Sequence, residues 1–380
     1  MGGAGPVLRM RRPPPSKGLS RPRPHWGPVA GPPFRFLPRY GSVLEGGRSP
    51  QFVHARLWEV DLEPASGDQA LWALHDRECA GLRASGRLDG PPDAGDPPGS
   101  RTLPEGRASL MDLKVELARR LTSPCELCER RCRAERAAGM AGRCGVLEPR
   151  VASSFIHHGE EAELVPSHTI FLSGCNLECQ FCQNWEISRS PGAGRRATPE
   201  LCAGLIREEE RHCRNVNWVG GDPIPSLHLV LATLRLYTGG RPLPQVWNSN
   251  MYMTEEAMRL LGCTMDVYLA DFKYGSDACA ERLSRVERYF EIVSRNHREG
   301  HRQAELLVRH LVLPGHVECC SIPVLEWLRR ELGPVRVNVM GQYHPDYRAG
   351  EHPDIARRLT GEEFMRAHRH AEGLGLLGLD

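Results

Sequence analysis

The sequence predicts an α/β protein with a largely parallel sheet and helices packed outside it. From about Pro166, short runs rich in β-branched and aromatic residues alternate with segments of helical spacing, and six such runs follow one another. Strands that alternate with helices indicate parallel pairing through helical crossovers. The 380 residues allow two or three domains, or one barrel with appendages. Both a doubly wound sheet and a curved, incomplete (β/α) barrel fit this regularity.

The composition excludes several classes of protein. The 49 Lys and Arg residues balance 47 Asp and Glu residues, so neither a basic nucleic-acid-binding protein nor an acidic solvating chain is expected. No stretch of 18 apolar residues occurs, so we expect no membrane span and no membrane partner. The basic start of the chain is not followed by an apolar run, which argues against secretion and for a cytoplasmic location.

We expect residues 1–104 to form a mostly disordered extension rich in Pro, Gly and Arg. Seventeen of the 31 prolines lie there, and eight Lys or Arg residues precede the first acidic residue, Glu45. Proline at this density prevents a continuous helix. A mitochondrial transit peptide would share the basic character but would be an amphipathic helix. Within this region, residues 51–75 are apolar enough for one short element.

The remainder divides into a cysteine-rich segment, residues 105–150, and an α/β body with a C-terminal helix, residues 151–380. The predicted strands are 168–174, 215–221, 244–250, 266–274, 306–314 and 335–343. The predicted helices are 198–213, 225–237, 254–262, 276–284, 287–300, 321–333 and 360–375. Thr198, Thr254 and Thr360 are N-cap residues of the kind that start a helix.

Polar residues gather toward the carboxyl ends of several predicted strands. Because side chains alternate along a strand, Asp271 shares a face with Lys273, and Asn248 shares one with Asn250. The predicted strand 335–343, continued to His344, places four polar residues on one face: Arg336, Asn338, Gln342 and His344. Parallel-sheet enzymes place their chemistry at these strand ends. Polar side chains directed inward favour the open barrel over a flat sheet.

A cysteine triplet with the spacing C-x3-C-x2-C follows the first predicted strand: Cys175, Cys179 and Cys182. In a reducing compartment such a cluster points to metal ligation. Three thiolates can hold a four-iron cluster while leaving one iron open to another ligand. A structural zinc site would need a fourth protein ligand, and the nearby His168 lies on the strand, away from the loop. Spacing and position favour the iron–sulfur cluster.

In this context the sequence resembles the radical S-adenosylmethionine (SAM) superfamily. The run GCNLECQFCQN, with GGDP after the next strand, resembles the branch of pyruvate formate-lyase-activating-enzyme homologues, over about residues 110–370. The resemblance implies an incomplete (β/α)6-type barrel and an oxidoreductase that cleaves SAM at a [4Fe-4S] cluster. The 5′-deoxyadenosyl radical so formed abstracts hydrogen from a substrate.

The resemblance assigns roles to individual residues of this sequence. It implies no catalytic residue beyond the cluster ligands. Cys175, Cys179 and Cys182 match those ligands. Asp222 replaces the glutamate of the family's GGE motif, so its carboxylate is one methylene shorter. The positions that match the SAM site are Phe181, Gly220, Gly221, Asp222, Asn248, Ser249, Asp271, Lys273, Arg309 and His344. Taken alone, Asp271 and Lys273 would also fit a structural ion pair, and His344 a structural histidine.

A second cysteine cluster, Cys125, Cys128, Cys132 and Cys144, precedes the body. Four thiolates can close a zinc site or hold an auxiliary [4Fe-4S] cluster. We expect a structural metal site and leave open whether it takes zinc or iron–sulfur. Arginines surround it, and a solvated basic face is expected. The seven other cysteines are expected to be ordinary buried thiols: Cys79, Cys202, Cys213, Cys263, Cys279, Cys319 and Cys320.

The substrate stays open. The resemblance implies either activation of a glycyl-radical enzyme or action on a different protein or a small molecule, because fold and cofactor do not determine substrate. Candidate residues at the barrel mouth are Trp185, Tyr252, Tyr343 and Tyr347. The expected partner is a one-electron reductant of the flavodoxin or ferredoxin kind. The rival hypothesis, a non-enzymatic zinc or iron–sulfur scaffold or adaptor, does not need the polar strand ends.

Overall fold

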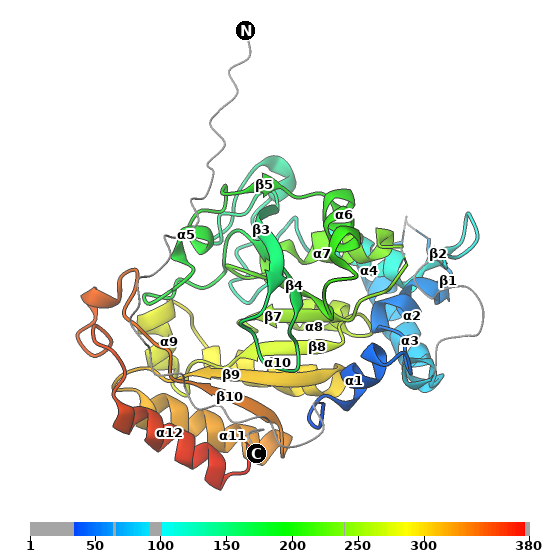
Figure 1. The fold of residues 1–380 in the computed structure, drawn as a ribbon. Coiled ribbons are helices and arrows are strands. Elements are labelled where there is room, and N and C mark those ends of the chain that lie inside the picture. Colours follow the sequence, from blue (N-terminus) through cyan, green and yellow to red (C-terminus); the bar gives the residue numbers. More distant parts are fainter. Residues whose placement is uncertain (1–33, 64–65, 91–100, 239, 377–380) are drawn as a thin grey trace.

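The computed structural model describes residues 34–63, 66–90, 101–238 and 240–376, and an eight-stranded sheet lies at its centre (Figure 1). The strand order is β10-β9-β8-β7-β6-β4-β3-β5. The strands are β3 (Arg150–His157), β4 (Ser167–Leu172), β5 (Arg195–Arg196), β6 (Asn215–Gly220), β7 (Gln245–Ser249), β8 (Val267–Asp271), β9 (Glu305–Leu311) and β10 (Arg336–Met340). A separate antiparallel pair joins β1 (Glu59–Val60) to β2 (Ala108–Ser109).

Helices fill the connections between the strands. The α-helices are α1 (Pro38–Leu44), α2 (Gln51–Leu57), α3 (Asp68–Ala84), α4 (Leu110–Arg120), α5 (Trp185–Ser188), α6 (Pro199–Glu209), α7 (Leu227–Leu236), α8 (Glu255–Leu261), α9 (Asp277–Ser284), α10 (Tyr289–Gln303), α11 (Ile322–Leu332) and α12 (Gly361–Gly373). The 3-10 turns are η1 (Arg87–Asp89), η2 (Arg136–Ala138), η3 (Ile224–Ser226) and η5 (Ala349–Glu351), and η4 (Val317–Ser321) is a π-helical turn.

The α/β class and the parallel sheet predicted from the sequence are confirmed. All six predicted strands are present as β4 and β6 to β10, and every neighbouring pair among them is parallel. They pair in chain order, without the reversal that defines a doubly wound sheet. The predicted helix starts are also confirmed, because Thr198, Thr254 and Thr360 each accept a hydrogen bond from the backbone of the first turn.

The sheet is strongly curved. Glu160 and Glu161, adjacent residues in the loop between β3 and β4, contact opposite parts of it: Asn217 on β6 donates to Glu160 at 3.2 Å, and Asn338 on β10 donates to Glu161 at 2.8 Å. Three strands separate β6 from β10 in the sheet. In a flat sheet four spacings of about 4.8 Å would place these strands about 19 Å apart. Two neighbouring side chains bridge them because the sheet curls around the loop.

The expectation of a mostly disordered extension over residues 1–104 is wrong for the described residues 34–63, 66–90 and 101–104. Helices α1, α2 and α3 form there and bury apolar side chains such as Tyr40, Phe52 and Leu71. Proline density misled the prediction because Pro38 stands at the first position of α1 and Pro50 immediately before α2, where proline is tolerated. The prolines of residues 1–33 and 91–100 lie outside the described residues.

Buried polar contacts tie these N-terminal helices to the body. The Asp266 carboxylate accepts hydrogen bonds from the backbone of Gln51 at 3.0 Å and of Gln245 at 2.8 Å, which joins the start of α2 to β7. Lys114 on α4 is fully buried and donates to the carbonyl oxygens of Leu260 (3.1 Å) and Gly262 (2.8 Å). The described residues of 34–63 and 66–90 therefore share hydrophobic core clusters with the sheet.

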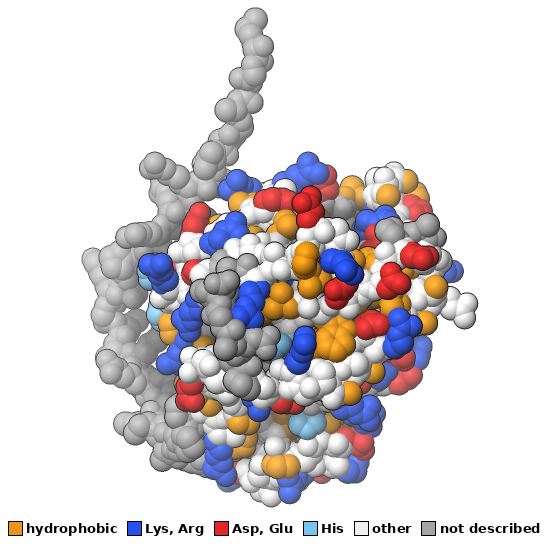
Figure 2. Space-filling model, turned by 90° about the vertical axis from the view of Figure 1, so that its right-hand side faces the viewer, with side chains coloured by type: hydrophobic (Ala, Val, Ile, Leu, Met, Phe, Trp, Pro, Cys, Tyr) orange, Lys and Arg blue, Asp and Glu red, His pale blue; other side chains and the backbone are white. Residues whose placement is uncertain are grey.

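The face formed around α1 to α4 carries mixed charge. Lys and Arg side chains are interspersed there with Asp and Glu, and hydrophobic side chains are scattered among them (Figure 2). This agrees with the balanced composition of the whole chain. None of the helices in the described ranges has both the length and the apolar character to cross a bilayer.

Candidate functional site

A cavity of about 260 Å³ opens at the carboxyl ends of the parallel strands. The loop after β4 and the ends of β6, β7, β8 and β9 all contribute to its wall, as expected for a parallel sheet. The structure brings nine of the ten predicted SAM positions and the whole cysteine triplet to this one place. They are Phe181, Gly220, Gly221, Asp222, Asn248, Ser249, Asp271, Lys273 and Arg309, with Cys175, Cys179 and Cys182.

The three thiols of the triplet lie on the loop between β4 and α5, and each has a polar neighbour. Asn250 approaches the Cys175 Sγ at 3.8 Å, the Ser284 hydroxyl donates to Cys179 at 3.0 Å, and Cys182 lies 3.3 Å from the Ser188 hydroxyl. Burial raises the pKa of Cys179 to about 11, so the protein alone favours the protonated thiol. Binding to iron would deprotonate it, because a coordinated thiol is held as the thiolate.

The triplet loop is held by backbone contacts to the end of α9. The amide of Glu178 donates to the Ser284 carbonyl at 3.1 Å, and the amide of Gln180 donates to the Leu283 carbonyl at 2.8 Å. The last carbonyls of a helix have no partner within it, so they are available to a neighbouring segment. Helix α9 therefore determines where Cys179 lies.

The two glycines after β6 permit a close approach between neighbouring backbones. A Cβ atom at Gly220 would lie 1.9 Å from the Leu172 carbonyl oxygen, and one at Gly221 would lie 2.2 Å from the Gly174 carbonyl oxygen. Gly220 also has a φ of +142°, which side-chain-bearing residues rarely adopt. These glycines let the turn after β6 pack against the start of the triplet loop.

Asp222 is buried, and its carboxylate is held by groups from two strand ends. It accepts hydrogen bonds from the backbone of Asn250 (2.8 Å) and of Ile224 (3.0 Å) and from the Ser249 hydroxyl (3.2 Å). Burial raises the pKa of Asp222 to about 7, although these hydrogen bonds lower it. A buried carboxylate at the wall of a polar cavity would be stabilised by a cation bound there.

Asp271 and Lys273 form an ion pair at the end of β8. Burial lowers the pKa of Lys273, but the Asp271 carboxylate and, where ionised, the thiolates of Cys179 and Cys182 raise it above its ordinary value. Lys273 therefore keeps its positive charge beside the triplet. The same contact is also what a purely structural ion pair would show, which is the alternative that the sequence allowed for these two residues.

Arg309 lines the cavity, but its guanidinium already has two partners. It donates to Glu161 through two hydrogen bonds, at 2.8 and 2.7 Å, and pairs with Glu160 as well. The nearby carboxylates raise its pKa although burial lowers it. The family resemblance assigned Arg309 to the SAM site as a cation at the end of the fifth strand. The two glutamates lie almost 150 positions upstream, so nothing in the sequence indicated that they contact it. The structure makes it the centre of a buried ion-pair cluster.

His344 is the predicted position that the structure does not bring to the cavity. Its side chain is 42% exposed, and its Nδ1 lies 4.0 Å from Asp346. The loop after β10 carries it outward, whereas a continued strand would have directed it inward.

The aromatic candidates for the mouth lie around the cavity, not in its wall. Trp185 and Tyr347 stack with ring centroids 5.7 Å apart, and Trp185 is exposed. Tyr252 and Tyr343 are buried, and their hydroxyls donate to the carbonyl oxygens of Glu287 and Ile355. Trp185, the exposed member of this pair, follows directly on Asn184, which lines the cavity. It therefore marks one rim of the opening.

The four cysteines of the second cluster lie together in the structure. Its four cysteines line one small pocket: Cys125, Cys128, Cys132 and Cys144. Three of the five arginines around it have carboxylate partners, so the expected basic face is neutralised in part. Arg131, Arg133 and Arg143 form ion pairs with glutamates, and Arg130 and Arg136 donate to backbone carbonyls.

Asn176 joins the two cysteine clusters. It lines the second pocket and follows Cys175 directly in the chain. Its carbonyl accepts from Arg130 at 2.9 Å, and its side chain accepts from Asn250 and donates to the Tyr252 carbonyl, both at 2.8 Å. The second cluster thus packs against the first residues of the triplet loop.

Sequence reasoning treated the seven other cysteines as ordinary buried thiols. Cys79, Cys202, Cys213 and Cys263 are buried, which confirms the expectation for them. Cys279 is half-buried and Cys319 is exposed, so the expectation is wrong for these two. Together with Cys320 and His316 they form a third group of metal-ligand type. The pair Cys319-Cys320 three residues after a histidine was the signal that could have found it.

Comparison with known proteins assigns the family. The model of the radical SAM superfamily matches residues 169–328, which hold the triplet and the ends of β6 to β9. The uncharacterized protein MJ0674 of Methanocaldococcus jannaschii is 45% identical over 346 residues, which are 90% of this chain and 98% of that protein. The chain carries a radical SAM superfamily domain.

Solved structures with lower similarity include two further proteins. Streptococcus suis SuiB bound to its precursor peptide SuiA is 12% identical, with a TM-score of 0.39 over 52% of this chain and 43% of that one. A radical SAM methyltransferase from Sphaerobacter thermophilus is 15% identical, with a TM-score of 0.40 over 56% of this chain and 65% of that one. This radical SAM chain thus spans less than half the length of SuiB.

Membership of the radical SAM superfamily brings two cofactors, a [4Fe-4S] cluster and SAM, and the need for an external reductant. The residues of the cavity fit both groups. Three soft thiol ligands lie on one loop for the cluster. The buried Asp222 carboxylate and the Asn248 and Ser249 side chains lie beside them, and their donor and acceptor atoms suit the polar end of SAM.

Proposed function

We propose that this radical SAM enzyme binds its [4Fe-4S] cluster through Cys175, Cys179 and Cys182 and SAM in the cavity beside them. One observation carries the proposal: the triplet and the polar ends of four parallel strands line the same cavity. A cluster held by these three cysteines, once reduced by an external donor, would supply the electron for cleavage of SAM to methionine and a 5′-deoxyadenosyl radical, which would abstract hydrogen from a substrate. A non-enzymatic scaffold would not require the strand ends to converge on the thiols.

The protein's own residues would position these groups. The Asp222 carboxylate would accept from the SAM ammonium, and the amide of Asn250 and the Ser249 hydroxyl hold it in place. Gly220 and Gly221 bring the backbone of β6 close to the triplet loop. Lys273 adds positive charge near the thiols. Phe181, whose ring packs on Tyr343 and Tyr274, would border the adenine and exclude water.

We interpret the curved sheet as the incomplete (β/α)6-type barrel of this superfamily. The sequential parallel order and the bridging of β6 and β10 by Glu160 and Glu161 support this. In this proposal residues 151–380 form the barrel and its C-terminal helix, and residues 105–150 form the cysteine-rich segment. Residues 34–90 join the barrel as an additional layer of helices.

We propose a structural metal, zinc or iron–sulfur, at Cys125, Cys128, Cys132 and Cys144. The four thiols line one pocket, and Asn176 connects that pocket to the triplet loop. Bound there, the metal would fix the position of Asn176 and hence of Cys175. The neutralised arginines give no support to docking of an acidic reductant at this face.

The proposed test is formation of 5′-deoxyadenosine. The protein is reconstituted anaerobically with iron and sulfide, reduced with dithionite and given SAM. We expect 5′-deoxyadenosine from the wild type and none from Cys179→Ser. Cys213→Ser serves as the control, because Cys213 is a buried thiol outside the three cysteine groups and a serine there can still donate to the Glu209 carbonyl. Wild-type protein with a full cluster but without product would contradict the proposal.

For the substrate we propose a protein, of which a glycyl-radical enzyme is the first candidate. The exposed stack of Trp185 and Tyr347 at the rim supports it, because such a surface suits a polypeptide better than a small polar molecule. Its reductant would be a flavodoxin- or ferredoxin-like protein in the reducing cytoplasm. Incubation with a candidate partner should yield a glycyl-radical signal in electron paramagnetic resonance. Action on another protein or a small molecule would also pass a hydrogen atom to the 5′-deoxyadenosyl radical and form 5′-deoxyadenosine, but it would not yield the glycyl-radical signal.

A further inference from the structure

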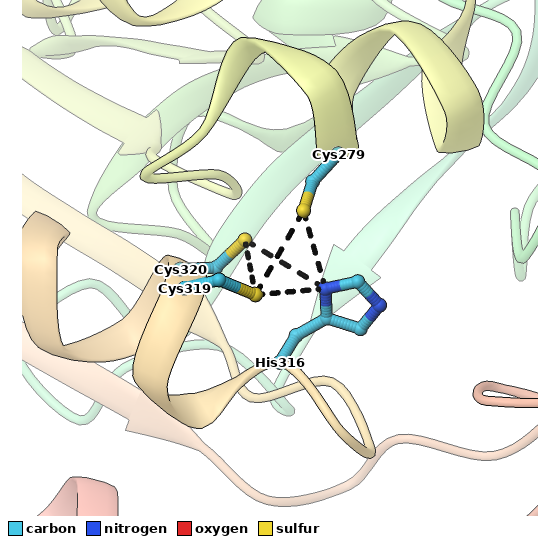
Figure 3. A group of neighbouring side chains, drawn as sticks. All are labelled: Cys279, His316, Cys319 and Cys320. Carbon is cyan, nitrogen blue, oxygen red and sulfur yellow. Dashed lines mark hydrogen bonds between the residues drawn. The ribbon is translucent and has the colours of Figure 1, made fainter.

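Four side chains of metal-ligand type converge outside the cavity and outside the second cysteine pocket. Cys279 comes from the first turn of α9, His316 directly precedes η4, and Cys319 and Cys320 lie on η4 (Figure 3). Their four ligand atoms all lie within 4.8 Å of one another. The π-helical turn sends two consecutive cysteines toward the same point, and such turns are frequent at functional sites.

The spacing of these atoms is that of a tetrahedron around a single metal ion. Metal bonds of about 2.3 Å to sulfur and about 2.0 Å to nitrogen place two sulfurs about 3.8 Å apart and sulfur and nitrogen about 3.5 Å apart. The Cys319 Sγ lies 3.8 Å from that of Cys279 and 3.9 Å from that of Cys320. The His316 Nδ1 lies 3.4, 3.3 and 3.9 Å from the sulfurs of Cys279, Cys319 and Cys320.

A four-iron cluster, a disulfide and chance packing all fit this group less well than a single ion does. A four-iron cluster would hold its ligands farther apart, because each thiolate binds a separate iron. A disulfide needs its sulfurs about 2.0 Å apart, and Cys279, Cys319 and Cys320 are all free thiols. Chance packing of buried thiols does not account for a histidine nitrogen among them or for the exposed position of Cys319.

A second layer of contacts orients the histidine for ligation. The His316 Nε2 lies 2.8 Å from the Asp354 carboxylate, which can only accept, so the ring proton belongs on Nε2 and the lone pair of Nδ1 faces the sulfurs. Arg282 pairs with the same carboxylate, 3.1 Å from one of its oxygens, and so holds the carboxylate behind the ring. Its guanidinium also lies 3.1 Å from the His316 Nε2, but a group that can only donate makes no hydrogen bond with a protonated Nε2. A carboxylate behind a ligating histidine is the usual support of a metal site.

We propose that Cys279, His316, Cys319 and Cys320 bind one zinc ion as a closed structural site. Three thiolates and one imidazole are an established ligand set for structural zinc, and four protein ligands leave no open position for catalysis. Binding releases the thiol protons to solvent. This inference does not depend on the proposed function, because none of these four residues lines the SAM cavity.

The proposed zinc would couple η4 to the cysteine triplet through α9. Cys279 lies in the first turn of α9, and Ser284, about 8 Å further along the helix, ends it. The Ser284 hydroxyl donates to the Cys179 Sγ at 3.0 Å, and its carbonyl accepts from the triplet loop. A metal that fixes the start of α9 therefore helps to fix the loop at the end of this helix.

The test is the metal content of full-length protein purified anaerobically without added metal. We expect Cys279→Ser, Cys319→Ser and His316→Ala each to lose one zinc per chain while keeping most of the iron, because the three cysteines of the triplet are unchanged. Cys213→Ser is the matched control and should keep both metals. Cys128→Ser separates the two sites, because it reports any zinc held at Cys125 to Cys144 independently. Because Cys319 is exposed, Cys319→Ser is the variant best suited to keep the fold.

Cobalt gives a second readout that needs no folding-sensitive variant. Wild-type protein loaded with Co²⁺ should show the visible bands of tetrahedral cobalt and a sulfur-to-cobalt charge-transfer band, and Cys319→Ser should reduce both. Equal zinc contents in the wild type and all three ligand variants would overturn the proposal. Loss of iron in place of zinc would overturn the assignment of the metal.

Discussion

The carboxylate of Glu305, the first residue of β9, accepts a hydrogen bond of 2.7 Å from the backbone amide of Tyr40 on α1. Its second oxygen accepts from the amide of Arg39 at 2.5 Å. Amides in the first turn of a helix have no partner inside that helix. A side chain 265 positions away therefore caps α1 and attaches the N-terminal helices to the sheet.

Glu305→Ala should lower the stability of the protein. It leaves two amides of α1 without an acceptor, and each buried unpaired donor costs about 1–3 kcal/mol. Anaerobic thermal unfolding would measure the effect. Glu362→Ala, an exposed glutamate of α12, is the control and should change stability little. An unchanged melting temperature for Glu305→Ala would show that α1 is held by its apolar contacts alone.

Stability should depend on pH through the same carboxyl group. Burial raises the pKa of Glu305 to about 7, above its ordinary value of 4.5 in the unfolded chain. Between these values the folded state binds the proton more tightly, so the contribution of Glu305 to stability falls as pH rises from about 4.5 to 7. Glu305→Gln removes this titration. The unfolding free energy of the wild type minus that of Glu305→Gln should therefore decrease from pH 5 to pH 8, and a constant difference would contradict this.

Two N-terminal deletions should differ sharply. Removal of residues 1–32 leaves every described contact in place, so cluster content and melting temperature should stay at the wild-type level. Removal of residues 1–100 also deletes α1, α2 and α3, whose apolar side chains are part of the core. This longer deletion should yield little folded protein and little iron. Iron analysis and size-exclusion chromatography would distinguish the outcomes, and a well-folded longer deletion would contradict the role of these helices.

A substitution of Arg309 can distinguish a structural role from a SAM-binding role for this residue. Arg309→Gln leaves Glu160 and Glu161 buried without their cation, which costs about 3–5 kcal/mol. Arg309→Gln combined with Glu161→Gln should recover part of that loss, because the two residues interact directly. Thermal unfolding of both variants measures the coupling. Weaker SAM binding without loss of stability in Arg309→Gln would return Arg309 to the role suggested by the sequence.

Asp222→Asn should weaken SAM binding by at least tenfold. It removes the negative charge proposed to face the SAM ammonium and places an amide where Asn250 and Ile224 donate. Equilibrium dialysis of labelled SAM against reconstituted protein measures the change. Asn248→Ala, which alters the same wall without changing its charge, is the comparison and should have a smaller effect. Equal affinities for Asp222→Asn and the wild type would remove Asp222 from the site.

Local patterns in the sequence determined the class of fold and most of the candidate site. The six strands, their helices and the threonine caps follow from periodicity and capping, which depend on residues close together in the chain. Cys175, Cys179 and Cys182 lie on a single loop, so their spacing in the sequence was enough to identify them as a group. The strand-end residues Asp222, Asn248 and Asp271 reach the same cavity because parallel strands end at one edge.

Contacts between distant segments were decided by the tertiary structure alone. Glu160 and Glu161 form ion pairs with Arg309 from about 150 positions away. Glu305 caps helix α1, which lies in a region where the proline content argued against helices. Cys279 meets His316, Cys319 and Cys320 only because α9 and η4 pack side by side. Local periodicity carries no information about such pairs, since burial and hydrogen bonding select partners by their position in space.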